Sequence, residues 1–334
     1  MHVATMLNGR YMAAAGSAMA NVLFIKTSSL GDVIHHMPAL VEARRRLPGA
    51  RFAWVVEEAF APLVRLHPGV DEVIPVASRR WRHALLAAAT WREMRAFRQV
   101  VRSRLYDEVI DTQGLLRTAV ITQVARGRRH GYDAASIREP LAARFYDVRH
   151  RVGRELHAIE RNRILTGLAL GYAPDGAVDF GLDRAALMGK AGAPCAILLH
   201  ATARETKQWP EERWIALGRA LAARGLEPQL PWGTDAERQR SERIAGAIPG
   251  ARVPDRRPLD ELARRIAAAQ VVVGVDTGLL HLAAALGVPL VGIFIGSEPG
   301  LTGPQGRGPI AIVGGKGAMP EMTDVLAALD RVAG

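Results

Sequence analysis

The sequence predicts an α/β protein made of two doubly wound domains, each with a parallel sheet covered by helices on both faces. Short runs rich in Val, Ile and Leu alternate with longer segments whose apolar residues recur at helical spacing. This alternation stops in a segment rich in Gly, Asp, Ala and Pro at 171–194 and then resumes. The length of 334 residues suits about two domains of ~150 residues each. Strands that alternate with helices form parallel sheets, and we therefore expect two such sheets.

The individual elements follow from the same pattern. In the first half we expect strands at 22–25, 52–56, 73–76 and 109–111, and helices at 33–47, 80–105 and 115–125. In the second half we expect strands at 196–199, 227–230, 271–275 and 290–294, again separated by helices. We place the domains at 21–175 and 176–320, followed by a C-terminal helix at 321–334 that could pack back towards the first domain. Two domains of this kind imply a cleft between them, with ligands at the carboxyl ends of the strands.

The N-terminal residues 1–20 resemble a weak signal peptide, with Arg10 followed by an alanine-rich run. Alanine and glycine stand where leucine is typical, and a strand is expected directly afterwards. We therefore interpret this segment as a disordered extension, with Met19 as an alternative start. No apolar run reaches the ~18 residues of a membrane-spanning helix.

Composition narrows the classes of partner. The formal net charge is +11, and nearly all of the excess is arginine. Such a surplus suits an anionic partner, although it also fits a compositional bias. The only cysteine, Cys195, excludes an intrachain disulfide and a cysteine-based metal cluster, and its apolar surroundings suit a reducing compartment.

The segment "KTSSLGDVIHHMPAL", from Lys26 to Leu40, joins the first expected strand to the first expected helix. Gly31 allows a ligand to approach the backbone, and a helix N-terminus favours an anion. Asp32 is either a helix cap or an acid–base group, and the loop alone leaves both open. No Gly-Lys-Ser/Thr and no Gly-x-Gly-x-x-Gly occurs there, which disfavours a nucleotide site in the first half.

The second half offers a better nucleotide site. In "GVDTGLLHLAAALGVPLVGIF", Asp276, Thr277 and Gly278 end a strand where a helix begins, and His281 follows on its first turn. Backbone N–H groups at that point suit a phosphate. A second loop, "HATARETKQWPEERW", contains Thr202 and Lys207, and lysine is a compact phosphate donor. A cap followed by an ordinary histidine is the alternative for the first loop.

Several segments together resemble the lipopolysaccharide heptosyltransferase I family, in order and spacing, from residue 21 onward. They are "VLFIKTSSLGDVIHHMPAL", "WVVEEAF", "VIPVASRRWR", "DTQGLLRTA", "HATARETKQWPEERW", "LPWGTDAE" and "VDTGLLHLAAALGVP". The resemblance implies a GT-B glycosyltransferase with two Rossmann-like domains, the acceptor on the first and the donor on the second. It implies transfer of L-glycero-D-manno-heptose from ADP-heptose to the inner Kdo of Kdo2-lipid A, with inversion. The His200-Ala201-Thr202 segment favours type I over type II enzymes, which carry a Pro-Gly-Ala-Glu type segment there.

The resemblance also implies roles for residues. Asp32 corresponds to the general base of the family. Donor contacts would fall on Thr202, Lys207, Glu237, Asp276, Thr277, Gly278 and His281. Glu237 is also explained as an exposed helix-start carboxylate. Ala203 stands where the family often has a second threonine, which predicts weaker donor binding.

The excess arginine then fits an anionic acceptor. Arg79, Arg80 and Arg82 cluster after the third expected strand, and arginine forks match carboxylate and phosphate oxygens. A solvated helix face is the alternative. The acceptor-binding set that we predict is Ser28, Ser29, Gly31, Arg79, Arg80, Arg82, Arg117 and Arg138. Because the acceptor is embedded in a bilayer, a basic first domain favours peripheral attachment to the cytoplasmic face of the inner membrane. We expect a monomer.

The remaining expectations concern cofactors and rival functions. No Asp-x-Asp pair stands in a suitable loop, so we expect catalysis without a metal or other cofactor. A nucleic-acid-binding protein is a rival on charge, but the sequence lacks a helix-turn-helix, zinc or RNP signature, and we expect no nucleic-acid partner. A transferase of the same architecture with another nucleotide-sugar donor is the second rival.

Overall fold

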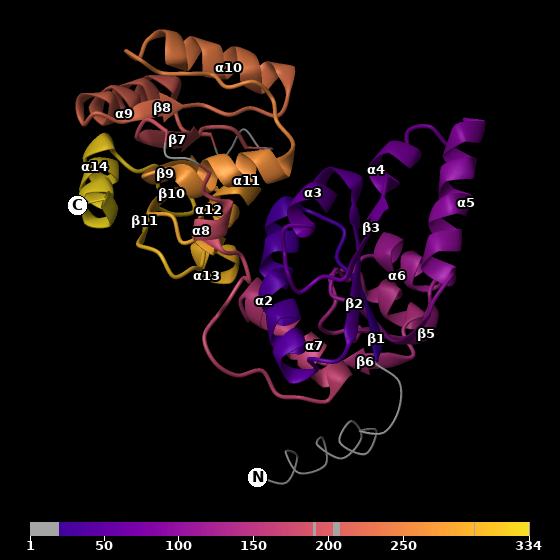
Figure 1. The fold of residues 1–334 in the computed structure, drawn as a ribbon. Helices are drawn as coiled ribbons and strands as arrows, with labels where there is room; N and C mark the ends of the chain where they lie inside the picture. The colour runs from indigo at the N-terminus through magenta and orange to yellow at the C-terminus, as the bar shows by residue number, and fades with distance from the viewer. Residues whose placement is uncertain (1–19, 190–191, 203–207, 297, 334) are drawn as a thin grey trace. The chain divides into compact units, whose positions relative to one another are not determined.

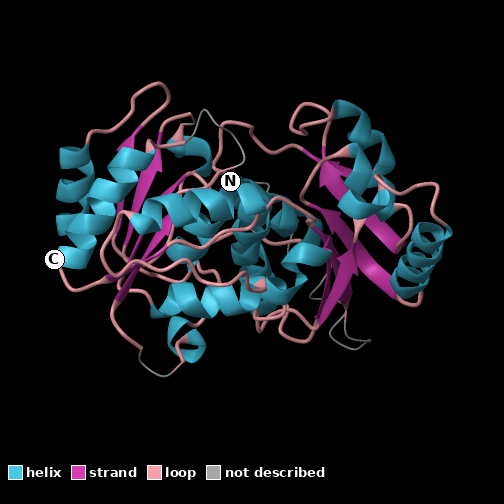
Figure 2. Cartoon of the chain, turned by 90° about the horizontal axis from the view of Figure 1, so that it is seen from above, coloured by secondary structure: helices cyan, strands magenta, loops and turns pink. Residues whose placement is uncertain are grey.

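The computed structural model describes residues 20–189, 192–202, 208–296 and 298–333. The chain divides into two compact units, Met1–Gly181 and Leu182–Gly334 (Figure 1). Each unit contains a parallel sheet flanked by helices, which confirms the predicted fold class (Figure 2). Among the residues described, no helix combines the length and the apolar character needed to cross a membrane.

The first unit contains six parallel strands in the order β3-β2-β1-β4-β5-β6. The strands are β1 (Asn21–Ile25), β2 (Arg51–Glu57), β3 (Glu72–Val76), β4 (Leu105–Asp111), β5 (Arg126–Tyr132) and β6 (Val148–His150). The order reverses between β1 and β4, because the chain first winds outward to β3 and then returns to the other side of β1. That reversal is the position where doubly wound sheets bind ligands.

Helices cover both faces of this sheet. They are α2 (Leu30–Arg46), α3 (Ala61–Val64), α4 (Ser78–Trp81), α5 (Ala88–Arg102), α6 (Leu116–Thr122) and α7 (Ala158–Leu170), with short 3₁₀ turns at Glu58–Phe60 and Pro140–Phe145. Helices α2 and α7 lie together on one face. Residues of α4, α5 and α6 share a core with β1 to β4 on the other. Alternate strand residues thus point into two separate cores, because successive side chains of a strand face opposite sides.

The second unit contains five parallel strands in the order β11-β10-β9-β7-β8. They are β7 (Cys195–Leu199), β8 (Glu227–Gln229), β9 (Val271–Val275), β10 (Leu290–Phe294) and β11 (Ile310–Gly314). The helices are α8 (Arg184–Leu187), α9 (Glu211–Ala223), α10 (Asp235–Gly246), α11 (Leu259–Ala268), α12 (Gly278–Ala285), α13 (Pro299–Thr302) and α14 (Met322–Ala333). The order reverses between β7 and β9, which places a second ligand position in this unit.

The last helix, α14, belongs to the core of the second unit. Its buried residues Val325, Ala328, Leu329 and Val332 pack in the same cluster as the buried residues of α9 and the inner strands. This helix, which the sequence analysis expected could pack back towards the first domain, packs on β10, β11 and α9. The two compact units meet at Gly181 and Leu182, six residues after the boundary that the sequence predicts.

Two parts of the first unit differ from the predicted elements. The expected helix at 80–105 is divided into α4 and α5, and residues 82–87 between them form turns. The strands β5 and β6 and helix α7 were not predicted. The sequence of β5 begins with arginines and a glycine and therefore lacks the apolar run that predicts a strand. Its Gly127 and Gly131 lie so close to Tyr106 O and the Tyr146 ring, respectively, that a Cβ atom would clash.

Candidate functional site

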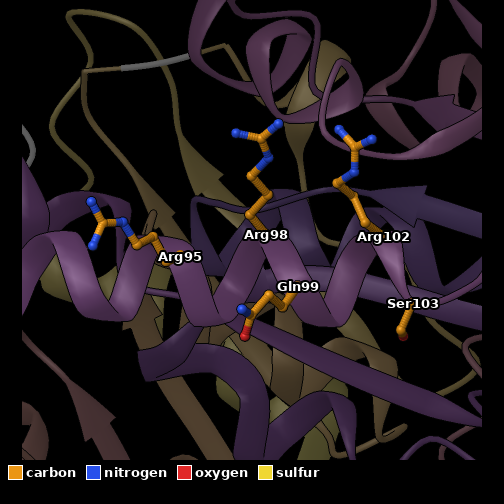
Figure 3. A pocket seen from close by; sticks show the side chains of 5 residues that line it. All are labelled: Arg95, Arg98, Gln99, Arg102 and Ser103. Atoms are coloured by element: carbon orange, nitrogen blue, oxygen red, sulfur yellow. The ribbon is translucent and has the colours of Figure 1, made fainter.

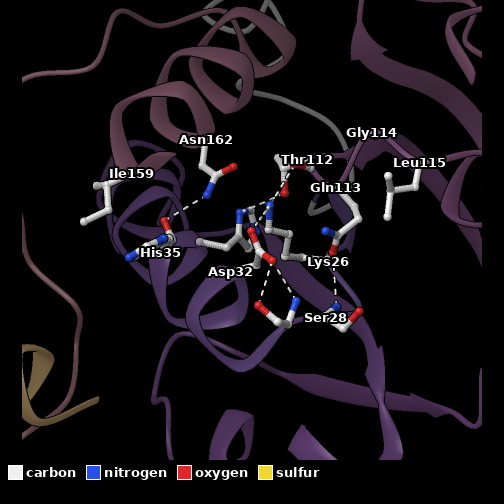
Figure 4. A network of polar contacts seen from close by, with 12 residues as sticks. Lys26, Ser28, Asp32, His35, Thr112, Gln113, Gly114, Leu115, Ile159 and Asn162 are labelled. Carbon is white, nitrogen blue, oxygen red and sulfur yellow. Dashed lines mark hydrogen bonds and ion pairs between the residues drawn. The ribbon is translucent and has the colours of Figure 1, made fainter. Parts of the chain in front are cut away.

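The first candidate site lies where β1 and β4 end side by side. Residues 26–29 follow β1, and residues 112–114 follow β4. The two strands pair directly, with Ile25 opposite Asp111. Their connections therefore meet at one edge of the sheet, where Figure 4 shows the side chains converging.

Asp32 stands at the start of α2 and combines a capping contact with a partly open carboxylate. The cap residue of α2 is Ser29, and Asp32 is the third helical residue. Its Oδ2 atom accepts hydrogen bonds from the Ser29 N–H at 2.7 Å and from the Ser29 hydroxyl at 3.0 Å. Its side chain is 39% exposed, and Oδ1 accepts no hydrogen bond from the described residues. One oxygen thus serves the helix start while the other is available to a substrate proton.

Lys26 places a buried positive charge beside that carboxylate. Its Nζ atom lies 3.9 Å from Asp32 Oδ1 and donates to Thr112 O at 2.9 Å. Burial lowers the pKa of Lys26, and the negative charges of Asp32 and Asp111 act in the opposite direction. The hydrogen bond from Lys26 Nζ to Thr112 O connects the loop after β1 with the loop after β4.

The loop after β4 fixes the backbone of the first loop. The Gln113 side chain accepts from the Ser28 N–H at 3.1 Å. Asp111, fully buried, accepts from the N–H groups of Gln113 and Gly114 and from the Tyr146 hydroxyl. Burial raises the pKa of Asp111, and its hydrogen bonds oppose that rise. These residues were not among the predicted site residues, although the "DTQG" segment at the end of a strand next to β1 was the available signal.

The predicted acceptor arginines fall into three separate places. Arg117, on the first turn of α6, donates from NH2 to Ser28 Oγ at 2.6 Å and so belongs to the site edge. Arg138 is exposed in the connection between β5 and the 3₁₀ turn that follows. Arg79, Arg80 and Arg82 follow the edge strand β3, and Arg80 is engaged by Glu58 and Glu93 at 3.0 and 2.8 Å. The structure thus brings only Arg117 to the predicted serines.

The second candidate site lies where β7 and β9 end in the second unit. Leu199 pairs with Gly274, so the loops that begin at His200 and Asp276 are neighbours. Thr202 Oγ1 donates to Asp276 O at 3.4 Å. Nε2 of the buried His281 lies 3.7 Å from Asp276 Oδ1. The predicted residues Thr202, Asp276 and His281 are therefore adjacent.

A helix start and a capping box complete this edge. Thr277 is the cap residue of α12, which begins at Gly278, and the first N–H groups of a helix have no intrahelical partner. Such groups suit a phosphate. Glu237 accepts from the N–H groups of Gly233 and Thr234 at 2.7 and 3.1 Å and thereby closes the capping box of α10. Lys207 and Ala203 lie outside the described residues.

Arg240, a residue that sequence analysis missed, holds both ends of the loop after β7. Its NH1 atom donates to His200 O at 3.0 Å, and NH2 donates to Trp209 O at 2.6 Å. Burial lowers the pKa of Arg240, while Glu211 acts in the opposite direction. An arginine in a helical stretch rich in charge gives no sequence signal for this bridging role.

Within the part of the chain that the structure describes, no group of three or more His, Cys, Asp or Glu residues is arranged to hold a metal ion.

Comparison with protein families gives one match over most of the chain. Residues 94–328 match the model of glycosyltransferase family 9 (heptosyltransferase).

Individual proteins extend this similarity to both units. The chain is 47% identical over 289 residues to lipopolysaccharide heptosyltransferase 1 of Pseudomonas aeruginosa, covering 86% of this chain and 81% of that protein. The structure of the Escherichia coli heptosyltransferase WaaC with ADP has a TM-score of 0.87 and 40% identity, over 93% of this chain and 99% of the other. The same enzyme with ADP-2-deoxy-2-fluoro heptose has a TM-score of 0.80 and 40% identity, over 94% and 97%.

Proposed function

Because the chain belongs to glycosyltransferase family 9, we propose that it is an inverting heptosyltransferase of lipopolysaccharide inner-core biosynthesis. It moves L-glycero-D-manno-heptose from ADP-heptose to the inner Kdo of Kdo2-lipid A. The observation that carries this assignment is the likeness over both units to lipopolysaccharide heptosyltransferase 1 and to WaaC with ADP and a heptose analogue. The GT-B architecture with two Rossmann-like units agrees with it.

We place the donor on the second unit. The helix start at Thr277 and Gly278 would receive the diphosphate, and backbone N–H groups aimed at a leaving group stabilise its growing charge. Thr202, Asp276 and His281 adjoin it, and Lys207 belongs to the same proposed set. Glu237 stands at the start of the neighbouring helix α10, where we propose a contact with the nucleoside ribose.

We place the acceptor on the first unit, with Asp32 as general base. Inverting transfer requires a base that takes the proton from the acceptor hydroxyl as the oxygen attacks the anomeric carbon. Asp32 Oδ1 is free to accept that proton, while Oδ2 holds the loop through Ser29. Ser28, Ser29, Gly31 and Arg117 belong to the same proposed acceptor set, and Arg117 can reach an acceptor carboxylate from its place beside Ser28.

The choice between a type I and a type II transferase is tested by the acceptor. We expect heptose transfer to Kdo2-lipid A and none to Kdo2-lipid A that already carries the first heptose. The measurement is mass spectrometry of both products with the same ADP-heptose. Preferential transfer to the heptosylated acceptor would favour the alternative, a type II-like enzyme.

Catalysis is proposed to need no metal ion. The helix start of α12 and Lys207 supply positive potential for the departing ADP. We expect full activity after exhaustive chelation with EDTA, measured by ADP release. Loss of activity that only a divalent cation restores would contradict this proposal.

The enzyme is proposed to act as a monomer, without nucleic acid, attached peripherally to the cytoplasmic face of the inner membrane. A lipid acceptor requires the first unit to reach a bilayer surface, and anionic lipid attracts clustered arginine. Binding of labelled Kdo2-lipid A but not of duplex DNA at physiological salt is the expected result.

A further inference from the structure

Helix α5 carries a row of arginines that the proposed active site does not use. Arg95, Arg98 and Arg102 recur at helical spacing on one side of the helix. Together with Gln99 and Ser103 they line an open depression of about 460 Å³. Figure 3 shows Arg98 and Arg102 extending to the same side of α5.

These arginines have no acidic partners. None of Arg95, Arg98 and Arg102 forms an ion pair or a side-chain hydrogen bond with any described residue. Arg80, in contrast, is engaged by both Glu58 and Glu93. The positive charge on α5 is therefore available to an external anion, whereas that of Arg80 is already neutralised within the unit.

Apolar side chains extend the same row beyond the start of the helix. Trp91 lies four residues before Arg95, on the same side of α5, and is 50% exposed. Its indole N–H donates to Leu85 O at 2.8 Å, which attaches the preceding turn to the helix. Leu85 is 51% exposed, and Leu86 is fully exposed.

The other side of α5 is fixed in the protein. Val101 is fully buried, and Met94 and Phe97 pack against the core that contains Trp81. Glu93 accepts from the Trp81 indole N–H at 2.8 Å. The exposed row is thus held by a packed helix, and its substitution leaves the core contacts in place.

We propose that this row, defined as Leu85, Leu86, Trp91, Arg95, Arg98 and Arg102 and called the α5 face, docks the first unit on a bilayer containing anionic phospholipid. Arginine side chains near such a surface are attracted to it, and Trp and Leu enter the headgroup region. The α5 face begins at the edge of the sheet where the strands end, which is also the edge of Asp32. Leu85 and Leu86 thus lie towards the edge of the acceptor site, while Arg102 lies at the other end of α5, where β4 begins.

The choice of a bilayer as partner rests on the proposed function, since its acceptor is a lipid. Binding is therefore measured without donor or acceptor, by co-sedimentation with vesicles. One set contains phosphatidylcholine only, and the other contains phosphatidylcholine and phosphatidylglycerol. The wild-type protein should bind the second set, and the binding should weaken with added salt because exposed charges are screened.

The test compares two triple variants that lose the same charge. Arg95→Gln/Arg98→Gln/Arg102→Gln should weaken binding to the anionic vesicles by about fivefold per arginine, or about 100-fold together. Arg256→Gln/Arg264→Gln/Arg331→Gln, at exposed positions of the second unit, should bind like wild type. Equal binding by both triple variants would overturn the proposal, as would equal binding of wild type to the two vesicle sets.

The apolar part of the α5 face has its own pair of variants. Leu86→Ser should reduce the binding that persists at high salt by about tenfold, because less apolar surface enters the bilayer. Leu301→Ser, at an exposed position of the second unit, should leave it unchanged. No difference between the two variants would contradict the apolar contact.

Transfer to an acceptor dispersed in detergent separates this inference from the proposed function. The α5 triple variant should keep wild-type transfer there, because it retains every residue of the proposed site. Vesicle binding through α5 without any transfer by wild type would support the α5 face and contradict the enzyme assignment. Heptose transfer by wild type together with vesicle binding that does not depend on the α5 arginines would support the enzyme assignment and contradict the α5 face. Duplex DNA bound through α5 in place of anionic vesicles would also overturn the proposal.

Discussion

Asp32→Asn should lower kcat for heptose transfer by about 100-fold or more, the range expected when a general base is removed. Asparagine keeps one side-chain oxygen that can accept from the Ser29 N–H, so the start of α2 should remain formed. It cannot take a proton from the acceptor. Binding of ADP-heptose, measured by titration calorimetry, should stay unchanged because the proposed donor residues lie in the second unit.

Asp183→Asn is a matched control for that substitution. Asp183 caps α8 by accepting from the N–H groups of Ala185 and Ala186 at 2.9 and 3.2 Å. It is a helix-start carboxylate outside both candidate sites, and its variant should transfer heptose like wild type. If Asp32→Asn is nearly as active as Asp183→Asn, Asp32 is only part of a capping box and the base lies elsewhere.

The second large effect is a loss of stability at acid pH, which the buried His67 and His200 should cause. Burial lowers the pKa of His67 to about 4, and burial followed by the charge of Arg240 lowers the pKa of His200 to about 4. In the unfolded chain a histidine titrates near 6.5. Between these values the unfolded state binds more protons, so the free energy of unfolding falls as pH falls. At pH 5 each histidine should remove on the order of 2 kcal/mol relative to pH 7.5.

Urea unfolding at pH 7.5 and pH 5 measures this loss. His67→Gln should show a smaller difference between the two pH values than wild type, because one titrating group is gone. His83→Gln, at an exposed position, should keep the wild-type difference. His67 and His200 belong to different units, and each unit should therefore lose stability on acidification. Equal midpoints for wild type at both pH values would contradict the account.

The fold followed from the sequence where strands are buried on both faces. The runs at 22–25, 52–56 and 271–275 are nearly continuous apolar segments, as parallel strands require, and the structure confirms them. Strand β5 was missed because its first four residues are three arginines and a glycine, exposed or only partly buried, instead of an apolar run. The break between α4 and α5 was missed because "HALLAAA" has high helix propensity, and tertiary contacts override propensity.

The site residues that directly follow an expected strand could be predicted from the sequence, whereas the residues that hold the loops in place could not. Lys26 and Asp32 in the first unit and the Asp276-Thr277-Gly278 turn in the second follow expected strands, and a doubly wound sheet places such residues at its own ligand-binding edge. Arg240 acts by bonding the backbone at both ends of a loop that is distant in sequence, through His200 O and Trp209 O. No local pattern marks such a contact, because it depends on where the folded chain brings carbonyl and N–H groups.

The most direct measurement of the central claim is heptose transfer by the wild-type enzyme, with the anomeric configuration of the product determined by NMR. ADP-L-glycero-β-D-manno-heptose and Kdo2-lipid A should give a product that contains one additional heptose in the α configuration, together with ADP. Inversion at the anomeric carbon is what a single displacement assisted by Asp32 requires. A β-linked product, or no transfer from this donor to this acceptor, would contradict the account.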